Sequence, residues 1–79
     1  MRNYVFGGFI ETSGKFDDGR EWKSLILLLA PKFGNEPPHT AKAYKARAFL
    51  ASTAKQISMG ATVTLQFDEQ GKIIGLNVV

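Results

Sequence analysis

Hydrophobic and polar residues alternate along much of this chain of 79 residues, as they do in strands that bury one face. The segment 61–67 shows the pattern most clearly. Its inward-facing positions are predicted to be Ala61, Val63, Leu65 and Phe67. The segments 3–12, 20–30 and 72–79 are also predicted to be strands, because they are rich in β-branched, aromatic and other apolar residues.

Glycines mark the bends and turns of the first predicted hairpin. Gly7-Gly8 interrupts the first strand, and paired glycines there predict a bulge that lets one strand bend around a barrel. The reversal at 13–19 ends in Asp18-Gly19, a strong hairpin signal because glycine accepts a positive φ. The connection is longer than a tight turn, so we expect projecting strand ends that form a flexible wing.

The second predicted strand changes its pattern along its length. Residues 20–24 alternate, and residues 25–29 are then continuously apolar. Such a run is expected of a segment that is buried on both sides or that packs against a partner subunit. An irregular loop, with one glycine and two adjacent prolines, is predicted to begin at Pro31 and to continue to His39.

The segment 40–57 allows two interpretations. It contains six alanines and neither glycine nor proline, so helix propensity alone favours one long helix capped by Thr40. That helix would leave four strands, in a ββαββ arrangement. The alternation from Tyr44 to Leu50 instead favours a half-exposed strand, and we prefer a strand that ends near Leu50.

A short helix is then predicted to follow this strand at roughly 52–58. Ser52 or Thr53 would be its N-cap, and Gly60 lies just beyond its C-terminus. Strand, hairpin, strand, short helix and closing hairpin is the chain order of a small OB barrel. The sequence therefore predicts an all-β fold, a five-stranded OB-fold barrel with one short helix between strands 3 and 4, as a single domain 1–79.

Composition narrows the classes of function. The chain has no cysteine and one histidine, which excludes disulfides and thiolate catalysis and argues against a zinc site. We expect no cofactor. A domain this small is marginal alone, so a homodimer is expected. The chain shows no signal peptide, and its longest apolar run, 25–31, is too short to span a bilayer, so a cytoplasmic location without a membrane partner is expected.

The segment around the short helix resembles a known family. Ala48-Phe49, then Ala54, and then Gly60-Ala-Thr-Val63 resemble the strand–helix–strand region of OB-fold single-stranded DNA-binding proteins. The turn glycine of that family is kept, whereas Met59 stands where the family has lysine. The chain is too short for the bacterial housekeeping type and lacks its acidic tail.

Length and wing are more similar to the small dimeric single-stranded DNA-binding proteins of filamentous bacteriophages, the gene V type. Ser13-Gly14 and Gly19-Arg20-Glu21-Trp22 match the wing of that family, where a glycine is followed by a basic residue, one further residue and an aromatic. The resemblance implies cooperative, largely sequence-independent coating of single-stranded DNA in phage replication, in the host bacterial cytoplasm. Asp17-Asp18, where basic residues are expected, and the alanine-rich third strand depart from the family.

Candidate binding residues are the cations and aromatic rings of the second and third strands and the wing. Single-strand binding needs cations for phosphates and flat faces for unpaired bases. The net charge is +3, and the segment 42–55 has four cations and no acid. The nucleic-acid-binding candidates are Lys15, Phe16, Arg20, Trp22, Lys23, Lys42, Tyr44, Lys45, Arg47 and Phe49. The resemblance implies that the outward face of these strands carries the DNA, with Trp22 matching the wing aromatic of the family.

Several of these residues also have a purely structural interpretation. Trp22 is either a stacking platform or a plug of the barrel. Lys15 and Arg20 could balance the two aspartates of the turn as solvated charges. Phenylalanines are more often core residues, which is the prediction for Phe6, Phe9 and Phe67, with Phe49 left open.

Catalysis is not expected. His39 lies in a loop without the nearby Ser, Asp or second His that chemistry would need, and turn geometry explains the adjacent aspartates. Two other functions stay open: an RNA-binding OB domain of cold-shock type, and a small protein-interaction barrel whose Leu25–Leu29 strand serves assembly only. The sequence does not choose between DNA and RNA.

Overall fold

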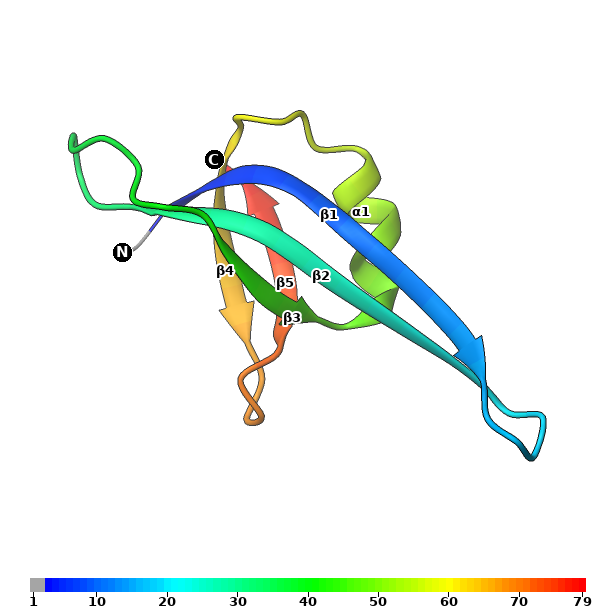
Figure 1. The fold of residues 1–79 in the computed structure, drawn as a ribbon. Helices are drawn as coiled ribbons and strands as arrows, with labels where there is room; N and C mark the ends of the chain where they lie inside the picture. Colours follow the sequence, from blue (N-terminus) through cyan, green and yellow to red (C-terminus); the bar gives the residue numbers. More distant parts are fainter. Residues whose placement is uncertain (1–2) are drawn as a thin grey trace.

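Five strands form a closed barrel in the computed structural model, which describes residues 3–79 (Figure 1). The elements are β1 (Asn3–Lys15), β2 (Glu21–Lys32), β3 (Lys42–Ala46), a 3-10 helix (Ala48–Leu50), α1 (Ala51–Lys55), β4 (Thr62–Phe67) and β5 (Ile73–Val78). The strand order is β1-β2-β3-β5-β4, and β4 pairs back onto β1. The β3–β5 contact is parallel and the other pairs are antiparallel. The predicted OB-like barrel is confirmed, and the ββαββ alternative is wrong.

The bend that closes the barrel lies at Gly7-Gly8, as predicted. The register of β1 against β2 shifts between Phe6 and Phe9, and Gly8 has a φ of 113°. β1 pairs with β2 on both sides of this bulge, and its N-terminal residues Tyr4 and Val5 also pair with β4, which closes the barrel. Figure 1 shows β1 and β2 as long curved neighbours that cross in front of the β4–β5 hairpin.

Alternate residues of the strands fill the interior. Leu25, Leu27 and Leu29 of β2 are fully buried, whereas Ile26 and Leu28 lie partly buried on the outer face. The continuous apolar run 25–29 is thus explained by side chains that alternate between the core and the outer face of β2. Phe6 is buried and Phe9 packs against the core, as predicted.

The prediction that Phe67 is a core residue is wrong. Its side chain is 45% exposed, although Val63 on the same strand is fully buried. The register of β4 against β5 shifts between Gln66 and Phe67, and this irregularity ends the inward–outward alternation just before Phe67.

The third strand is shorter than predicted and the helix begins earlier. β3 ends at Ala46, and Leu50 then donates its backbone N–H to Arg47 O at 3.0 Å, which starts the helical turns. The buried residues Leu50 and Ala54 are four positions apart, so they share one helix face and close the barrel together. Ser52 between them is exposed, whereas a continued strand would turn Ser52 to the same side as Leu50 and Ala54.

The predicted boundaries of the short helix are also wrong in detail. Neither Ser52 nor Thr53 is an N-cap, because both lie inside α1, and its start has no side-chain cap. Gly60 lies five residues beyond the last residue of α1, with a φ of 91°. Its backbone N–H donates to Phe6 O at 2.7 Å, so this glycine turns the chain into the barrel wall and does not cap the helix.

Two projections lengthen the molecule to 50 × 26 × 20 Å. The β1–β2 hairpin continues past the barrel to a turn at 16–20, which confirms the projecting wing, and the loop after β2 extends from the opposite end (Figure 1).

The prediction that the loop after β2 begins at Pro31 is wrong. Pro31 is buried within β2, and its backbone O accepts a hydrogen bond from His39 N–H at 2.8 Å. It lies beyond the part of β2 that pairs with β3, near the end of the strand, where proline is tolerated.

Candidate nucleic-acid interface

Trp22 lies on the wing, outside the barrel, opposite Gly14 of β1. A Cβ atom built on Gly14 would meet the indole ring at 2.6 Å, so the ring lies directly against the glycine backbone. The side chain is 39% exposed. One side of the indole is therefore covered by the paired strand while part of the ring faces solvent, and the interpretation of Trp22 as a barrel plug is wrong.

The tip of the wing is a turn with an exposed ring. Phe16 is 51% exposed, and the Arg20 guanidinium lies 5.2 Å from the centre of its ring. Arg20 Nε also pairs with Asp18 Oδ2 at 2.6 Å. Arg20 is therefore already engaged by its own turn, as the structural interpretation of its charge requires, although both partners are well exposed.

Four cations line one hollow where β3 ends. They are Lys23 of β2, Lys45 of β3, Arg47 just after β3, and Lys72 of the β4–β5 loop. Among residues 3–79, no ion-pair partner is found for Lys23, Lys45 or Lys72. Their positive charge is thus available to an anion in this hollow.

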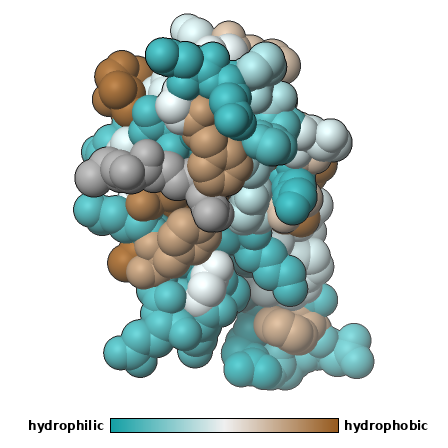
Figure 2. All heavy atoms as spheres, turned by 90° about the vertical axis from the view of Figure 1, so that its left-hand side faces the viewer, coloured by the Kyte–Doolittle hydropathy of each residue, from teal (hydrophilic) through white to brown (hydrophobic). Residues whose placement is uncertain are grey.

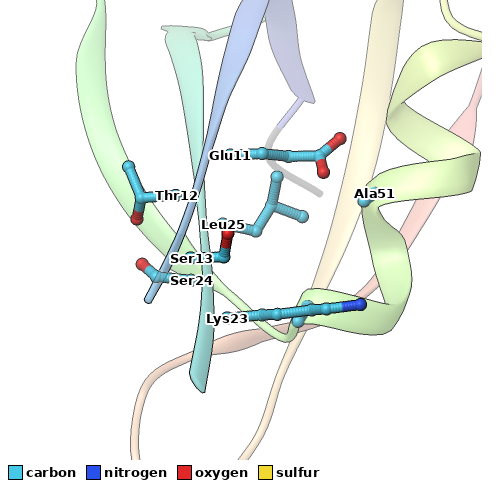
Figure 3. Close-up of a pocket in the computed structure, with 8 residues that line it drawn as sticks. Glu11, Thr12, Ser13, Lys23, Ser24, Leu25 and Ala51 are labelled. Carbon is cyan, nitrogen blue, oxygen red and sulfur yellow. The ribbon is translucent and has the colours of Figure 1, made fainter. Parts of the chain in front are cut away.

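The wing and this hollow share Lys23. Lys23 also lines a shallow depression on the wing with Lys15 and Trp22, so the indole and the cations follow one another along β2. Figure 3 shows that Lys23 extends toward the side of the hairpin that faces α1, whereas Thr12 and Ser24 point to the other side. Strand residues alternate in direction, so Trp22 lies on the same face as Ser24, and its ring and the Lys23 side chain are on opposite faces of the hairpin.

Lys72 was not among the residues that the sequence predicted. It follows the glycine of a hairpin loop and has no aromatic neighbour in the sequence. The signal was available in the fold class, because β5 is the neighbour of β3 in this strand order and its first residues therefore lie beside the end of β3. The pair Ala46 and Ile73 fixes this proximity.

Arg47 is held by the β4–β5 loop. Its Nη2 donates to Asp68 Oδ2 and, at 3.2 Å, to Gln70 Oε1. The partial burial of Asp68 acts to raise the pKa of this carboxyl group, but the hydrogen bonds from Lys72 N–H, Arg47 and Gln70 N–H together lower it. Asp68 therefore stays ionised and neutralises Arg47.

The segment 42–55 is acid-free in sequence but not in space. Lys55 Nζ pairs with Glu11 Oε1 at 3.2 Å, and Arg47 pairs with Asp68. The fold thus supplies carboxylates from β1 and from the β4–β5 loop to two of the four cations of the segment.

The other candidates of the third strand lie elsewhere. Tyr44 is opposite the fully buried Leu27, so its ring lies on the inner side of β3, edge-on to Tyr4 with the ring centres 5.8 Å apart. Lys42 lies beyond it, in a hollow at the opposite end of the barrel from the cations. Phe49 is 60% exposed on the 3-10 helix. The expectation that Lys42, Tyr44 and Phe49 share one outward face with Lys45 and Arg47 is therefore wrong, because β3 alternates and then ends.

The hollow around Lys42 is built from the loop after β2. It is lined by Pro31, Phe33, His39, Thr40, Lys42 and Tyr44. Phe33 and His39 are in edge-to-face contact, with 5.1 Å between ring centres. Figure 2 views the molecule from this end and shows apolar side chains in separate groups among hydrophilic ones. Of the described residues that line this hollow, one is a lysine, Lys42.

The fold and the hollow define a small OB-like barrel with a cationic site at the base of its wing. Comparison of the chain with family models, curated proteins and solved structures found no match. Within residues 3–79, no helix has the length and apolarity needed to cross a membrane. The same residues contain no group of three His, Asp or Glu side chains placed to hold a metal ion.

Proposed function

We propose that this protein binds single-stranded nucleic acid, with single-stranded DNA as its ligand, largely without sequence preference. The observation that carries the proposal is the convergence of Lys23, Lys45, Arg47 and Lys72 on one hollow, with the exposed indole of Trp22 on the adjoining wing. Cations that track phosphates and a flat ring for an unpaired base are the two requirements of single-strand binding. In an OB-like barrel this place, between the first hairpin and the β4–β5 loop, also suits an extended chain.

The phosphates supply most of the affinity in this proposal, and the stacked base supplies the preference for single strands. A duplex keeps its bases paired and stacked on one another, so no base is available to stack on Trp22 and the ring adds no affinity for the duplex. The resemblance to the gene V type extends the proposal to a homodimer that coats the strand cooperatively during phage replication in the host cytoplasm. The outer face of β1 and β2 supports the dimer, since Ile10 and Ile26 lie opposite each other there and Ile10 is 48% exposed.

The test is a titration of the protein with oligothymidylate, with a duplex and with an RNA of matched length, all at the same low salt concentration. We expect the oligothymidylate to bind more tightly than the duplex and to quench the fluorescence of Trp22, which is the one tryptophan of the chain. Equal binding of duplex and single strand without quenching would contradict the proposal. Tighter binding of the RNA would instead assign the site to an RNA ligand.

A further inference from the structure

Asp68 organises the loop that borders the cationic hollow. Its Oδ1 accepts hydrogen bonds from the backbone N–H groups of Gln70 and Lys72, each at 2.9 Å, while its Oδ2 accepts from Arg47. The two carboxylate oxygens thus have separate tasks. Oδ1 holds the backbone of the β4–β5 loop, and Oδ2 pairs with Arg47, which is one of the cations of the proposed binding site.

Arg47 is exposed enough to meet a ligand but is not free to do so. Its side chain is 40% exposed, whereas that of Asp68 is 16% exposed. A phosphate that approaches from solvent can therefore reach the guanidinium, but it must compete with a carboxylate that is already in place. Carboxylate and phosphate oxygens accept the same guanidinium hydrogens, so full engagement of either weakens the other.

We propose that Asp68 is a specificity-determining residue of this site, which holds Arg47 in the free protein and yields it to a phosphate only when a polyanionic strand is bound. The inference rests on the proposed function. A lone phosphate gains little at Arg47, because it only replaces an existing partner. A nucleic-acid strand bound through Lys23, Lys45 and Lys72 presents its next phosphate at a high effective concentration. This favours the replacement of Asp68 by a phosphate at Arg47.

The replacement of Asp68 by asparagine separates the two tasks of the side chain. The Oδ1 of Asn still accepts from the N–H groups of Gln70 and Lys72, but an amide nitrogen in the place of Oδ2 cannot accept from Arg47. Asp68→Asn therefore keeps the loop and releases the guanidinium. Glu69→Gln is the matched control, since Glu69 is an exposed neighbour whose loss changes the net charge equally without releasing Arg47.

The experiment measures the affinity of the wild type and both variants for oligothymidylate over a range of salt concentrations. We expect Asp68→Asn to bind up to about fivefold more tightly at low salt, the upper end of the range for release of a surface ion pair, and Glu69→Gln to change less. The slope of log affinity against log salt should become steeper by up to about 0.7, the value for one more neutralised phosphate.

A second measurement uses the wild type and does not depend on a variant. NMR titration of the Asp68 carboxyl, with and without saturating oligothymidylate, should show its pKa rising on binding, because Arg47 moves to a phosphate. An unchanged pKa, or an Asp68→Asn variant that binds no better than Glu69→Gln, overturns the inference while the proposed function stands. Failure of the wild type to bind the oligonucleotide at all overturns both.

Discussion

The indole of Trp22 lies so close to Gly14 that a methyl group on the glycine would be 2.6 Å from the ring. The two residues face each other across the β1–β2 hairpin, in the part that projects from the barrel. Glycine lets the ring lie flat on the strand, and the hairpin holds the ring without burying it. This arrangement leaves an aromatic ring exposed outside the core, as the proposed stacking of a base requires.

The first prediction follows from this pair. Trp22→Ala should weaken binding of single-stranded DNA by about 1–3 kcal/mol, the range for one base stacked on an aromatic ring. The melting temperature should change little, because the ring lies outside the core, where truncation of a large aromatic costs about 3–5 kcal/mol. Affinity by fluorescence anisotropy and melting by circular dichroism check the two parts.

Gly14→Ala is the companion variant. The added methyl group cannot fit beneath the indole, so the ring must turn away while the tryptophan itself is retained. We expect a loss of affinity in the same direction as for Trp22→Ala and a change in the tryptophan emission of the free protein. Full affinity in both variants would show that the bound DNA strand does not contact the indole of Trp22.

The barrel could be predicted from the sequence because its determinants are local. The glycine pair at 7–8, the Asp18-Gly19 turn and the alternation of 61–67 each act through neighbouring residues, and together they allow few topologies. The end of β3 could not be predicted in the same way. In the alanine-rich segment 40–57 each residue fits a strand or a helix, and the choice is made by burial of Leu50 and Ala54 against the rest of the barrel.

The candidate site was predictable only in part, for the same physical reason. Trp22 and Lys23 are consecutive residues after a turn, so their place on the wing can be derived from the sequence. The pairing of Arg47 with Asp68 joins residues 21 positions apart and depends on the parallel contact of β3 with β5. No periodicity along the chain encodes this contact, which also explains why Lys72 was missed.

The second prediction concerns the cations. Lys23→Ala and Lys45→Ala should each weaken binding equally on every sequence and lower the salt slope by about 0.7, the loss of one phosphate contact on a single strand. Lys32→Ala is the matched control, because Lys32 lies at the other end of β2, opposite Asn3, and outside the cationic hollow. Salt titrations of the three variants provide the measurement. If Lys32→Ala lowers the salt slope as much as Lys23→Ala and Lys45→Ala do, the DNA strand binds to a different face of the protein.

The third prediction concerns stability at acid pH. The pKa of Asp68 is lowered from its ordinary value of 3.8 in the folded protein, so the ionised carboxylate stabilises the fold. This stabilisation is fully present about one pH unit above the ordinary pKa of 3.8 and is lost as the pH falls through the lower pKa of the folded protein. Asp68→Asn lacks the titrating group. Its melting temperature should lie below that of the wild type at neutral pH, and the difference should shrink toward pH 2. A difference that stays constant over this range would contradict the role given to the carboxylate.

The last prediction concerns assembly. Ile10 and Ile26 face each other on the outer side of β1 and β2, and Leu28 extends this apolar surface along β2. We expect two copies to pack through it, because a barrel of this size gains stability from burial of such a face. Sedimentation equilibrium at micromolar concentration should give about twice the 8.7 kDa mass of the chain.

Ile26→Lys should give the monomer and remain folded, since the side chain points away from the core. Ile74→Lys, an equally drastic change at a position on β5 that is 39% exposed, should leave the dimer intact. A wild type that sediments only as an 8.7 kDa species, or an Ile74→Lys variant that dissociates while Ile26→Lys does not, would rule out this interface.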